Sequence, residues 1–179
     1  TVPERSSLNR VPFQHRDALP SLFDLRKQLE DLHRPHPEAI EKAWGYLDHS
    51  DRFVRWAAYV AIQHQPVDDW SVKALREPDA GKRVTALLAL AKATGVDPDH
   101  RSEDDAEVNP QWRNRMLRSA ASLNWADLNH DERLTLVRFY EITMNRMGEP
   151  GSRLKQRIIA QLDPQFPAES FDLNWMLCE

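Results

Sequence analysis

The sequence has a single cysteine, Cys178, and only five glycines among its 179 residues. One cysteine cannot form an internal disulfide, and it excludes the Cys-x-x-Cys-His pattern that attaches a c-type haem. It does not distinguish a reducing compartment from an oxidising one. Positive charge is not in excess either, because 24 Lys and Arg stand against 28 Asp and Glu, for a net charge of −4. No overall positive field attracts nucleic acid or an anionic membrane surface, although a local basic face remains open.

Long apolar runs are also missing, and none approaches the roughly 20 residues that a membrane-spanning helix needs. The sequence begins at Thr1 without a signal-peptide pattern and stops at Glu179 within an apolar stretch. We therefore expect the chain to be an excised fragment of a longer protein. Hydrophobic residues make up 41% of the chain and charged residues 29%, which is the balance of a folded globular domain.

Twelve prolines lie between apolar stretches of helical period, so they are read as helix starts and stops. Residues 1–17 lack this period and are expected to form an irregular arm. Residues 18–179 are expected to form one all-α domain of eight helices, in about four antiparallel pairs joined by short turns. Helix N-caps are predicted at Ser50 or Asp51, at Asn109 before Pro110, at Asn129 with Glu132 in a capping box, and at Ser170.

One pattern occurs twice. Asp51 and Arg55 precede an apolar helical run, and Asp79 and Arg83 precede another at the same spacing, 28 residues later. A repeat of roughly 20–50 residues built from helix pairs is typical of an α-solenoid, in which each unit buries its apolar face against the next. The first of these helices is apolar over most of its circumference, which predicts that it is buried between neighbours. It leaves only a narrow polar stripe of Arg52, Arg55, Tyr59 and Gln63.

The two segments 47–62 and 75–90 resemble the HEAT-repeat family, and the resemblance covers residues 37–94 well. It implies an α-α superhelix of HEAT/armadillo-like type. In that family the aspartate caps a helix and the arginine pairs with the acid of the next repeat, so Asp51, Arg55, Asp79 and Arg83 are expected to join repeats. The later helix pairs keep the layout but lack the Asp and Arg positions.

Residues 46–55, followed by the Gln-His-Gln-Pro of 63–66, are similar to the HEAT segments of large planctomycete-type multidomain proteins. There the segment connects a sugar-dehydrogenase-like β-propeller with a c-type cytochrome module. The resemblance implies an exported or periplasmic parent protein, whose oxidoreductase chemistry would lie outside this chain.

Neither a metal site nor a cofactor is predicted. His33 and His36 are the most plausible metal ligands, but Pro35 and Pro37 interrupt any helix there. Asp97 and Asp99 resemble the start of a calcium loop, yet Arg101 and Val108 occupy later ligand positions. The acidic segment 97–108 is instead expected to be a solvated insertion. No nucleophile, P-loop, dinucleotide or paired-carboxylate motif is present, so we expect no catalytic residues.

Glu141 lies on an otherwise apolar helical stretch, and the structural expectation is an ion pair with Arg138. Among the six tryptophans, Trp125 lies in a predicted turn and is the candidate for exposure. The other five fall on apolar helix faces and are expected in the core: Trp44, Trp56, Trp70, Trp112 and Trp175. In the last helix Phe171, Trp175 and Met176 are expected to face the preceding pair, leaving Leu173 and Leu177 with fewer neighbours.

These features predict a non-catalytic scaffold or protein-interaction segment that binds a protein partner or neighbouring domains. The face that we expect to bind the partner consists of Arg52, Arg55, Tyr59 and Arg83. The alternative is a HEAT-like nucleic-acid-binding or base-repair enzyme resembling DNA glycosylases that hold DNA on a concave surface. Because the chain is net acidic, no nucleic acid is expected as partner.

Overall fold

The computed structural model describes residues 21–100, 102–104 and 107–178, and the predicted arm 1–17 lies outside this range. Within it the chain is all-α, without a strand, and it has nine α-helices where eight were predicted. Two short 3-10 helices, Trp125–Asp127 and Asp163–Gln165, complete it. The α-helices are α1 Leu22–Glu30, α2 Ala39–Trp44, α3 Arg52–Gln63, α4 Val67–Arg76, α5 Ala80–Thr94, α6 Pro110–Ala120, α7 His130–Met147, α8 Ser152–Leu162 and α9 Phe171–Cys178.

The helix N-termini form where capping residues were predicted. Asp51 Oδ1 accepts from the backbone N–H groups of Phe53 and Val54 at 2.9 and 3.0 Å, and Asn109 caps α6 ahead of its first-turn proline. Asn129 and Glu132 form a capping box at the start of α7. Each cap satisfies donors that the helix cannot satisfy internally, so short polar signals fix where these helices begin.

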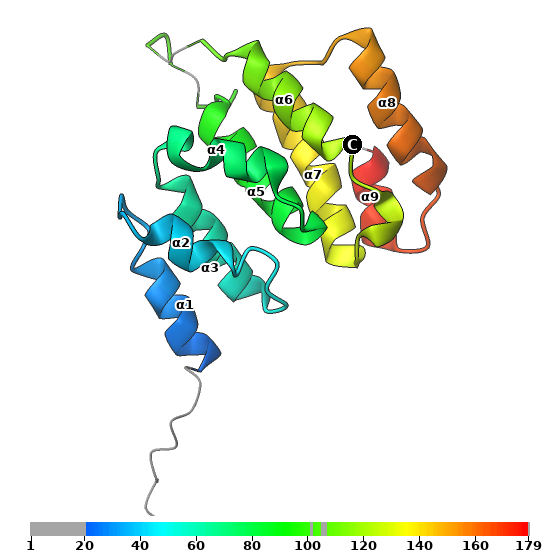
Figure 1. Cartoon of the computed structure of the whole chain (residues 1–179). Coiled ribbons are helices and arrows are strands. Elements are labelled where there is room, and N and C mark those ends of the chain that lie inside the picture. The colour runs from blue at the N-terminus through cyan, green and yellow to red at the C-terminus, as the bar shows by residue number, and fades with distance from the viewer. Residues whose placement is uncertain (1–20, 101, 105–106, 179) are drawn as a thin grey trace, which may run out of the picture.

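The helices pack in pairs and in a row. α2 lies against α3, α4 against α5, and α6 against α7, while α5 lies between α3 and α7 (Figure 1). α4 also contacts α6, so the first members of the second and third pairs lie side by side. α1 packs on α3 at one end, and α9 packs on α7 at the other. No described helix is long and apolar enough to cross a membrane.

α5 is the most enclosed helix and needs small residues where it meets its neighbours. Eight of its residues are buried, and most of these are alanine or medium aliphatic side chains. Gly81 lies in the first turn, where an added Cβ would come within 2.3 Å of Glu132 Oε1 on α7 and 3.4 Å of Asp48 Cβ. Glycine thus allows the beginnings of α5 and α7 to approach closely.

The structure corrects two of the five predicted core tryptophans. Trp70 and Trp44 are buried and Trp112 is partly buried, but Trp56 is 58% exposed and Trp175 is 61% exposed. In α9 the prediction was wrong for two more residues, because Leu173 packs inward while Phe171 is 81% exposed, and Met176 and Leu177 are both partly buried. Helical period identifies residues that share a face, but α9 is apolar on nearly every side, so the pattern could not say which face packs on α7.

Candidate functional site

Arg55 and Arg83 hold the turn that precedes their own helix. Arg55 Nη1 donates to the carbonyl oxygen of His49 at 2.5 Å, and Arg83 Nε donates to that of Glu77, in each case six residues back. Arg83 also lies 3.4 Å from Ser122 Oγ. The two arginines therefore occupy equivalent places, and each anchors a loop to a helix through charge-assisted hydrogen bonds.

The long-range partner of Arg55 differs from the expectation. The family resemblance implied an ion pair with the acid of the next repeat, Asp79, but Asp79 accepts from Lys82 N at 2.9 Å as the cap of α5. Arg55 Nη2 instead lies 3.0 Å from Asp131 Oδ2, in the first turn of α7. This contact skips one helix pair, because the starts of α3, α5 and α7 lie close together.

The residue four positions after the N-cap also anchors the preceding turn in α7 and α9, and sequence reasoning missed both cases. Four residues after the N-cap Asn129 stands Arg133, which donates to the Trp125 carbonyl at 3.4 Å and lies over the Trp125 ring. Four residues after Ser170 stands Asn174, which exchanges two hydrogen bonds with the backbone of Ala168. A search for polar residues four positions after each predicted N-cap would have found both, because a polar side chain there points back to the preceding turn.

Removing either anchoring arginine is expected to destabilise the fold. Arg55→Ala and Arg83→Ala should each lower the free energy of unfolding by about 1–3 kcal/mol, because turn carbonyls lose charged donors. Urea unfolding measures the change, with Arg76→Ala as the control, since Arg76 is exposed at the end of α4. Losses below about 0.5 kcal/mol, the level expected of surface substitutions, would show that the arginines are not anchors.

Three of the four residues predicted to bind a partner come together, and the fourth does not. Arg52, Arg55 and Tyr59 line a groove of about 540 Å³, which we call the α3–α5–α7 groove. Arg83 is turned toward the α6–α7 connection through Ser122 and is not part of it. Tyr59 is buried and forms the floor. The groove is lined by Arg52, Phe53, Arg55, Trp56, Tyr59, Thr85, Leu88, Lys92 and Thr135.

Two aromatic side chains form the exposed part of this groove, and one of them, Trp56, was predicted to lie in the core. Phe53 is 51% exposed and Trp56 is 58% exposed. The Phe53 ring lies beneath the Arg52 guanidinium, with 4.9 Å between the ring centroid and Cζ. The Trp56 and His33 rings meet edge to face, with 6.2 Å between their centroids. These contacts hold both rings in place while leaving apolar surface open.

The cations that line the groove or lie near its Lys92 are of two kinds. Arg55, Arg138 and Arg146 are paired with Asp131, Glu141 and Asp97. Arg52 and Lys92 form no ion pair with any described residue. Burial lowers the pKa of the Lys92 ammonium, and the nearby Arg146 and Arg138 lower it further. An anionic group that enters the groove would stabilise the charged form of Lys92 and so offset both effects on its pKa.

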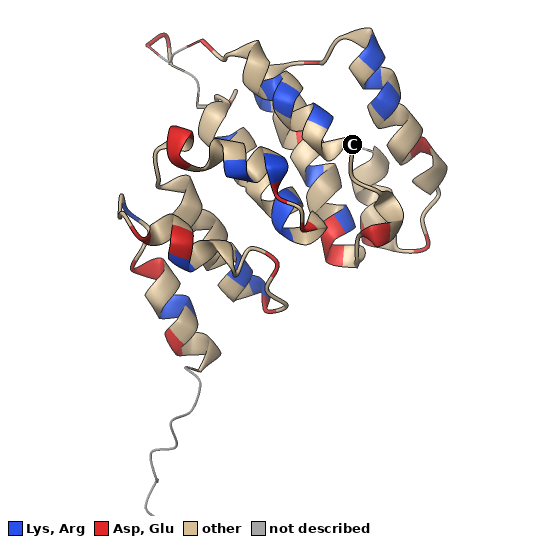
Figure 2. Cartoon of the chain, in the orientation of Figure 1, with Lys and Arg blue, Asp and Glu red and all other residues tan. Residues whose placement is uncertain are grey.

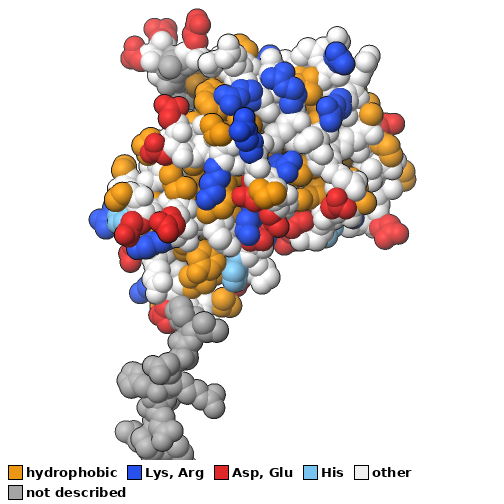
Figure 3. Space-filling view, in the orientation of Figure 1, with side chains coloured by type: hydrophobic (Ala, Val, Ile, Leu, Met, Phe, Trp, Pro, Cys, Tyr) orange, Lys and Arg blue, Asp and Glu red, His pale blue; other side chains and the backbone are white. Residues whose placement is uncertain are grey.

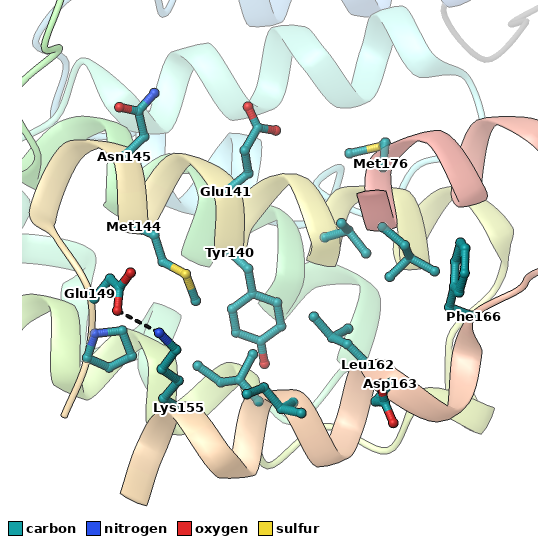
Figure 4. A pocket seen from close by; sticks show the side chains of 15 residues that line it. Tyr140, Glu141, Met144, Asn145, Glu149, Lys155, Leu162, Asp163, Phe166 and Met176 are labelled. Carbon is teal, nitrogen blue, oxygen red and sulfur yellow. Dashed lines mark hydrogen bonds and ion pairs between the residues drawn. The ribbon is translucent and has the colours of Figure 1, made fainter. Parts of the chain in front are cut away.

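A second hollow, of about 690 Å³, lies between α7, α8 and α9 and is mainly apolar (Figure 4). Tyr140 points into it from α7, and its hydroxyl donates to Gln161 Oε1 at 2.6 Å. Gln161 in turn donates to the Leu123 carbonyl at 2.8 Å. Lys155 is paired with Glu149. The polar groups in this hollow thus serve the packing of α8, and no set of groups converges on a reactive position.

The expected ion pair of Glu141 is confirmed. Arg138 Nη1 lies 2.7 and 2.5 Å from the two carboxylate oxygens of Glu141. Glu141 lines the α7–α8–α9 hollow at its rim, and Figure 4 shows it on the side of α7 away from Tyr140. Its position on an apolar stretch is explained by pairing with its helical neighbour.

The histidines and the acidic segment serve local structure. His33 Nε2 lies 2.9 Å from the Ala57 carbonyl, and His36 Nδ1 accepts from Glu38 N at 3.2 Å. Asp97 is bound to Arg146 on α7 at 2.6 Å, so this end of the acidic segment is anchored rather than freely solvated. Among the described residues no group of three or more His, Cys, Asp and Glu is placed to hold a metal ion.

Asp172 ties α9 to α7 in a pH-dependent way. Hydrogen bonds from His130, at 2.9 Å, and from Ser170 lower the pKa of Asp172 from 3.8 to about 2. A carboxylate with a depressed pKa stabilises the folded state above its unfolded pKa, and this stabilisation is lost as the pH falls toward the folded pKa. We expect α9 to loosen from α7 between about pH 4 and pH 2, as followed by amide NMR signals of α9. A matching transition in Asp172→Asn would contradict this assignment.

Comparison with protein-family models, with curated proteins and with solved structures finds no significant match to this chain. The functional argument therefore depends on the geometry of the chain itself.

Proposed function

We propose that this chain is a non-catalytic binding segment that holds a protein partner in the α3–α5–α7 groove. The observation that carries the proposal is the exposure of Phe53 and Trp56 beside Leu88 on a folded, well-packed surface. Exposed aromatic side chains in a groove are typical of protein-interaction sites, where buried aromatic anchors supply most of the binding energy. The unpaired Arg52 and Lys92 add a preference for carboxylates placed next to the apolar anchors of the partner.

We also propose that the chain is a segment of a HEAT-type α-solenoid. Two observations support this assignment. The N-cap and arginine positions recur at the starts of α3, α5 and α7, and these three helices pack in a row beside which α4 and α6 also contact each other. In such an array the row of second helices forms the binding surface. The α3–α5–α7 groove lies on this row, which suits a segment that docks or spaces the domains of a larger protein.

Nucleic acid is the second candidate occupant, because exposed aromatic rings beside cations also stack single-stranded bases. Of the five cations in or near the groove, only Arg52 and Lys92 form no ion pair with a described residue. The other three are already paired with carboxylates, and these acids would repel a phosphate backbone. We therefore rank a protein partner above a base-repair or other nucleic-acid function.

A random peptide library provides a test that does not require the partner to be identified. Peptides selected on the wild-type chain should combine aromatic or aliphatic anchors with one or two acidic residues. Their affinity should fall at least tenfold for Trp56→Ala and remain within twofold for Val72→Ala, because Val72 is exposed on α4, outside the groove. Selection that yields no groove-dependent peptide, while single-stranded DNA binds the groove, would reverse our ranking.

A further inference from the structure

Arginines from two helices face a common hollow on another part of the surface. The hollow has a volume of about 550 Å³ and lies between α6 and α8. α6 contributes Asn114 and Arg118, and the first two turns of α8 contribute Arg153 and Arg157 together with Ser152. We call this the α6–α8 arginine hollow. Figure 2 shows basic residues on both helices, and Figure 3 shows basic side chains gathered over α6 and the beginning of α8.

These three arginines have no partner within the described part of the chain. Arg118, Arg153 and Arg157 form neither an ion pair nor a hydrogen bond there, whereas Arg55, Arg138 and Arg146 each have a carboxylate. The acid that precedes α8, Glu149, is taken by Lys155 at 2.7 Å. In a chain of net charge −4, three unpaired guanidinium groups at one hollow are a local concentration of positive charge. Their mutual repulsion is relieved by an anion.

The number and type of the donors favour a phosphoryl group over a single carboxylate. Guanidinium groups donate in a planar fork that matches the oxygens of phosphate, and a phosphomonoester offers close to two negative charges and three terminal oxygens. Three arginines can therefore share one phosphoryl group, while a carboxylate has only two oxygens and one charge. The Ser152 hydroxyl lines the same hollow as a further donor.

The surroundings favour a phosphate on a protein over the backbone of a nucleic acid. The segment that leads into α6 contains the acids Asp99, Glu103, Asp104 and Glu107. A nucleic acid passing over α6 would carry further phosphates toward these carboxylates, which costs binding energy. A protein segment with one phosphate carries no such row of charges. We propose that the α6–α8 arginine hollow binds a phosphorylated serine or threonine of a partner protein.

This site is separate from the α3–α5–α7 groove, so the proposal does not depend on the one made above. It would give the scaffold a second contact whose affinity is set by phosphorylation of the partner, since Arg clusters are a recurrent means of recognising phosphorylated segments. Two weak contacts on one scaffold reinforce each other when a partner can reach both.

The test uses a 12-residue Gly/Ala-rich peptide with one central phosphoserine, its unphosphorylated form and a form with glutamate at that position. Binding to the full chain is measured by fluorescence anisotropy. We expect the phosphopeptide to bind at least tenfold more tightly than either control peptide. Arg118→Gln and Arg157→Gln should each weaken it at least fivefold. Arg34→Gln, which removes one exposed charge on the α1–α2 connection, should leave the affinity within twofold. Because all these arginines are exposed, the melting temperatures should be unchanged.

Each alternative occupant has its own outcome, and each would overturn the proposal. Equal affinity for the glutamate peptide would show a general acidic-peptide site. Tighter binding of a 12-nucleotide RNA that the phosphopeptide does not displace would indicate a nucleic-acid site. Equal losses for Arg34→Gln and Arg118→Gln would show attraction by overall charge alone, and no binding of the phosphopeptide would remove the site.

Discussion

Trp70→Ala is expected to lower the free energy of unfolding by about 3–5 kcal/mol, the loss typical of removing a large buried aromatic side chain. The Trp70 side chain is fully buried between α4 and its neighbours, and its indole N–H donates to the Gln65 carbonyl at 3.3 Å. Alanine would leave a cavity and an unsatisfied buried carbonyl, because the surrounding helices can collapse only in part. Urea unfolding followed by circular dichroism measures the loss.

Trp56→Ala is the matched control for this prediction. Trp56 is the same residue type on the neighbouring helix α3, but it is 58% exposed, so we expect a loss below about 1 kcal/mol. Equal losses for the two variants would show that Trp70 is no more buried in the folded chain than Trp56. The small expected effect also makes Trp56→Ala suitable for binding studies, since the variant should stay folded.

Gln65→Leu is expected to cost about 2–4 kcal/mol, although the two side chains are similar in size. Gln65 is 5% exposed, and its amide joins three separate backbone groups. Its Nε2 donates to the carbonyls of Ala61 and Arg34 at 2.8 and 2.9 Å, and its Oε1 accepts from His36 N at 2.9 Å. Leucine would leave the partly buried backbone groups of Arg34 and His36 in the α1–α2 connection without this partner, and the connection should detach from α3.

Gln28→Leu on α1 provides the comparison, because Gln28 is exposed. Its change in unfolding free energy should lie within about 0.5 kcal/mol of zero. If Gln65→Leu is equally neutral, the amide of Gln65 does not hold the α1–α2 connection, and the packing of α1 on α3 must be explained by apolar contacts alone.

The positions of most helices could be predicted because their signals are local. A cap such as Asp51 or Asn129 acts on backbone groups two or three residues away, so its effect is written in the nearby sequence. The same holds for the Arg138–Glu141 pair, whose members are one turn apart on α7. Features of this kind can be predicted without knowing how the helices pack on one another.

The orientation of apolar helices could not be predicted in the same way. On α3 apolar residues cover most of the circumference, so the pattern placed Trp56 in the core and Tyr59 on the polar stripe. The structure reverses both, since Tyr59 is 6% exposed. Which side of α3 faces solvent depends on where α1, α2 and α5 pack, and that information is spread over the whole chain.

Contacts between distant segments were also beyond the sequence. The pairing of Arg55 with Asp131 joins residues 76 positions apart, and the hydrogen bond from Trp44 Nε1 to Glu77 Oε2, at 2.7 Å, spans 33. Periodicity identifies neither partner. The candidate groove could therefore be predicted only in part: Arg52 and Arg55 follow from the polar stripe of α3, whereas Phe53, Trp56 and Lys92 emerge only from the packing of α3, α5 and α7.

The most direct test of the account is an NMR titration of the isotope-labelled chain with a peptide selected on the wild type. If the α3–α5–α7 groove binds the partner, the indole N–H signal of Trp56 and the amide signals of Phe53, Leu88 and Lys92 should shift together and saturate with one affinity. The same titration of Trp56→Ala should show at least tenfold weaker binding. Shifts confined to the apolar hollow between α7, α8 and α9, with an undisturbed Trp56 signal, would contradict the central claim.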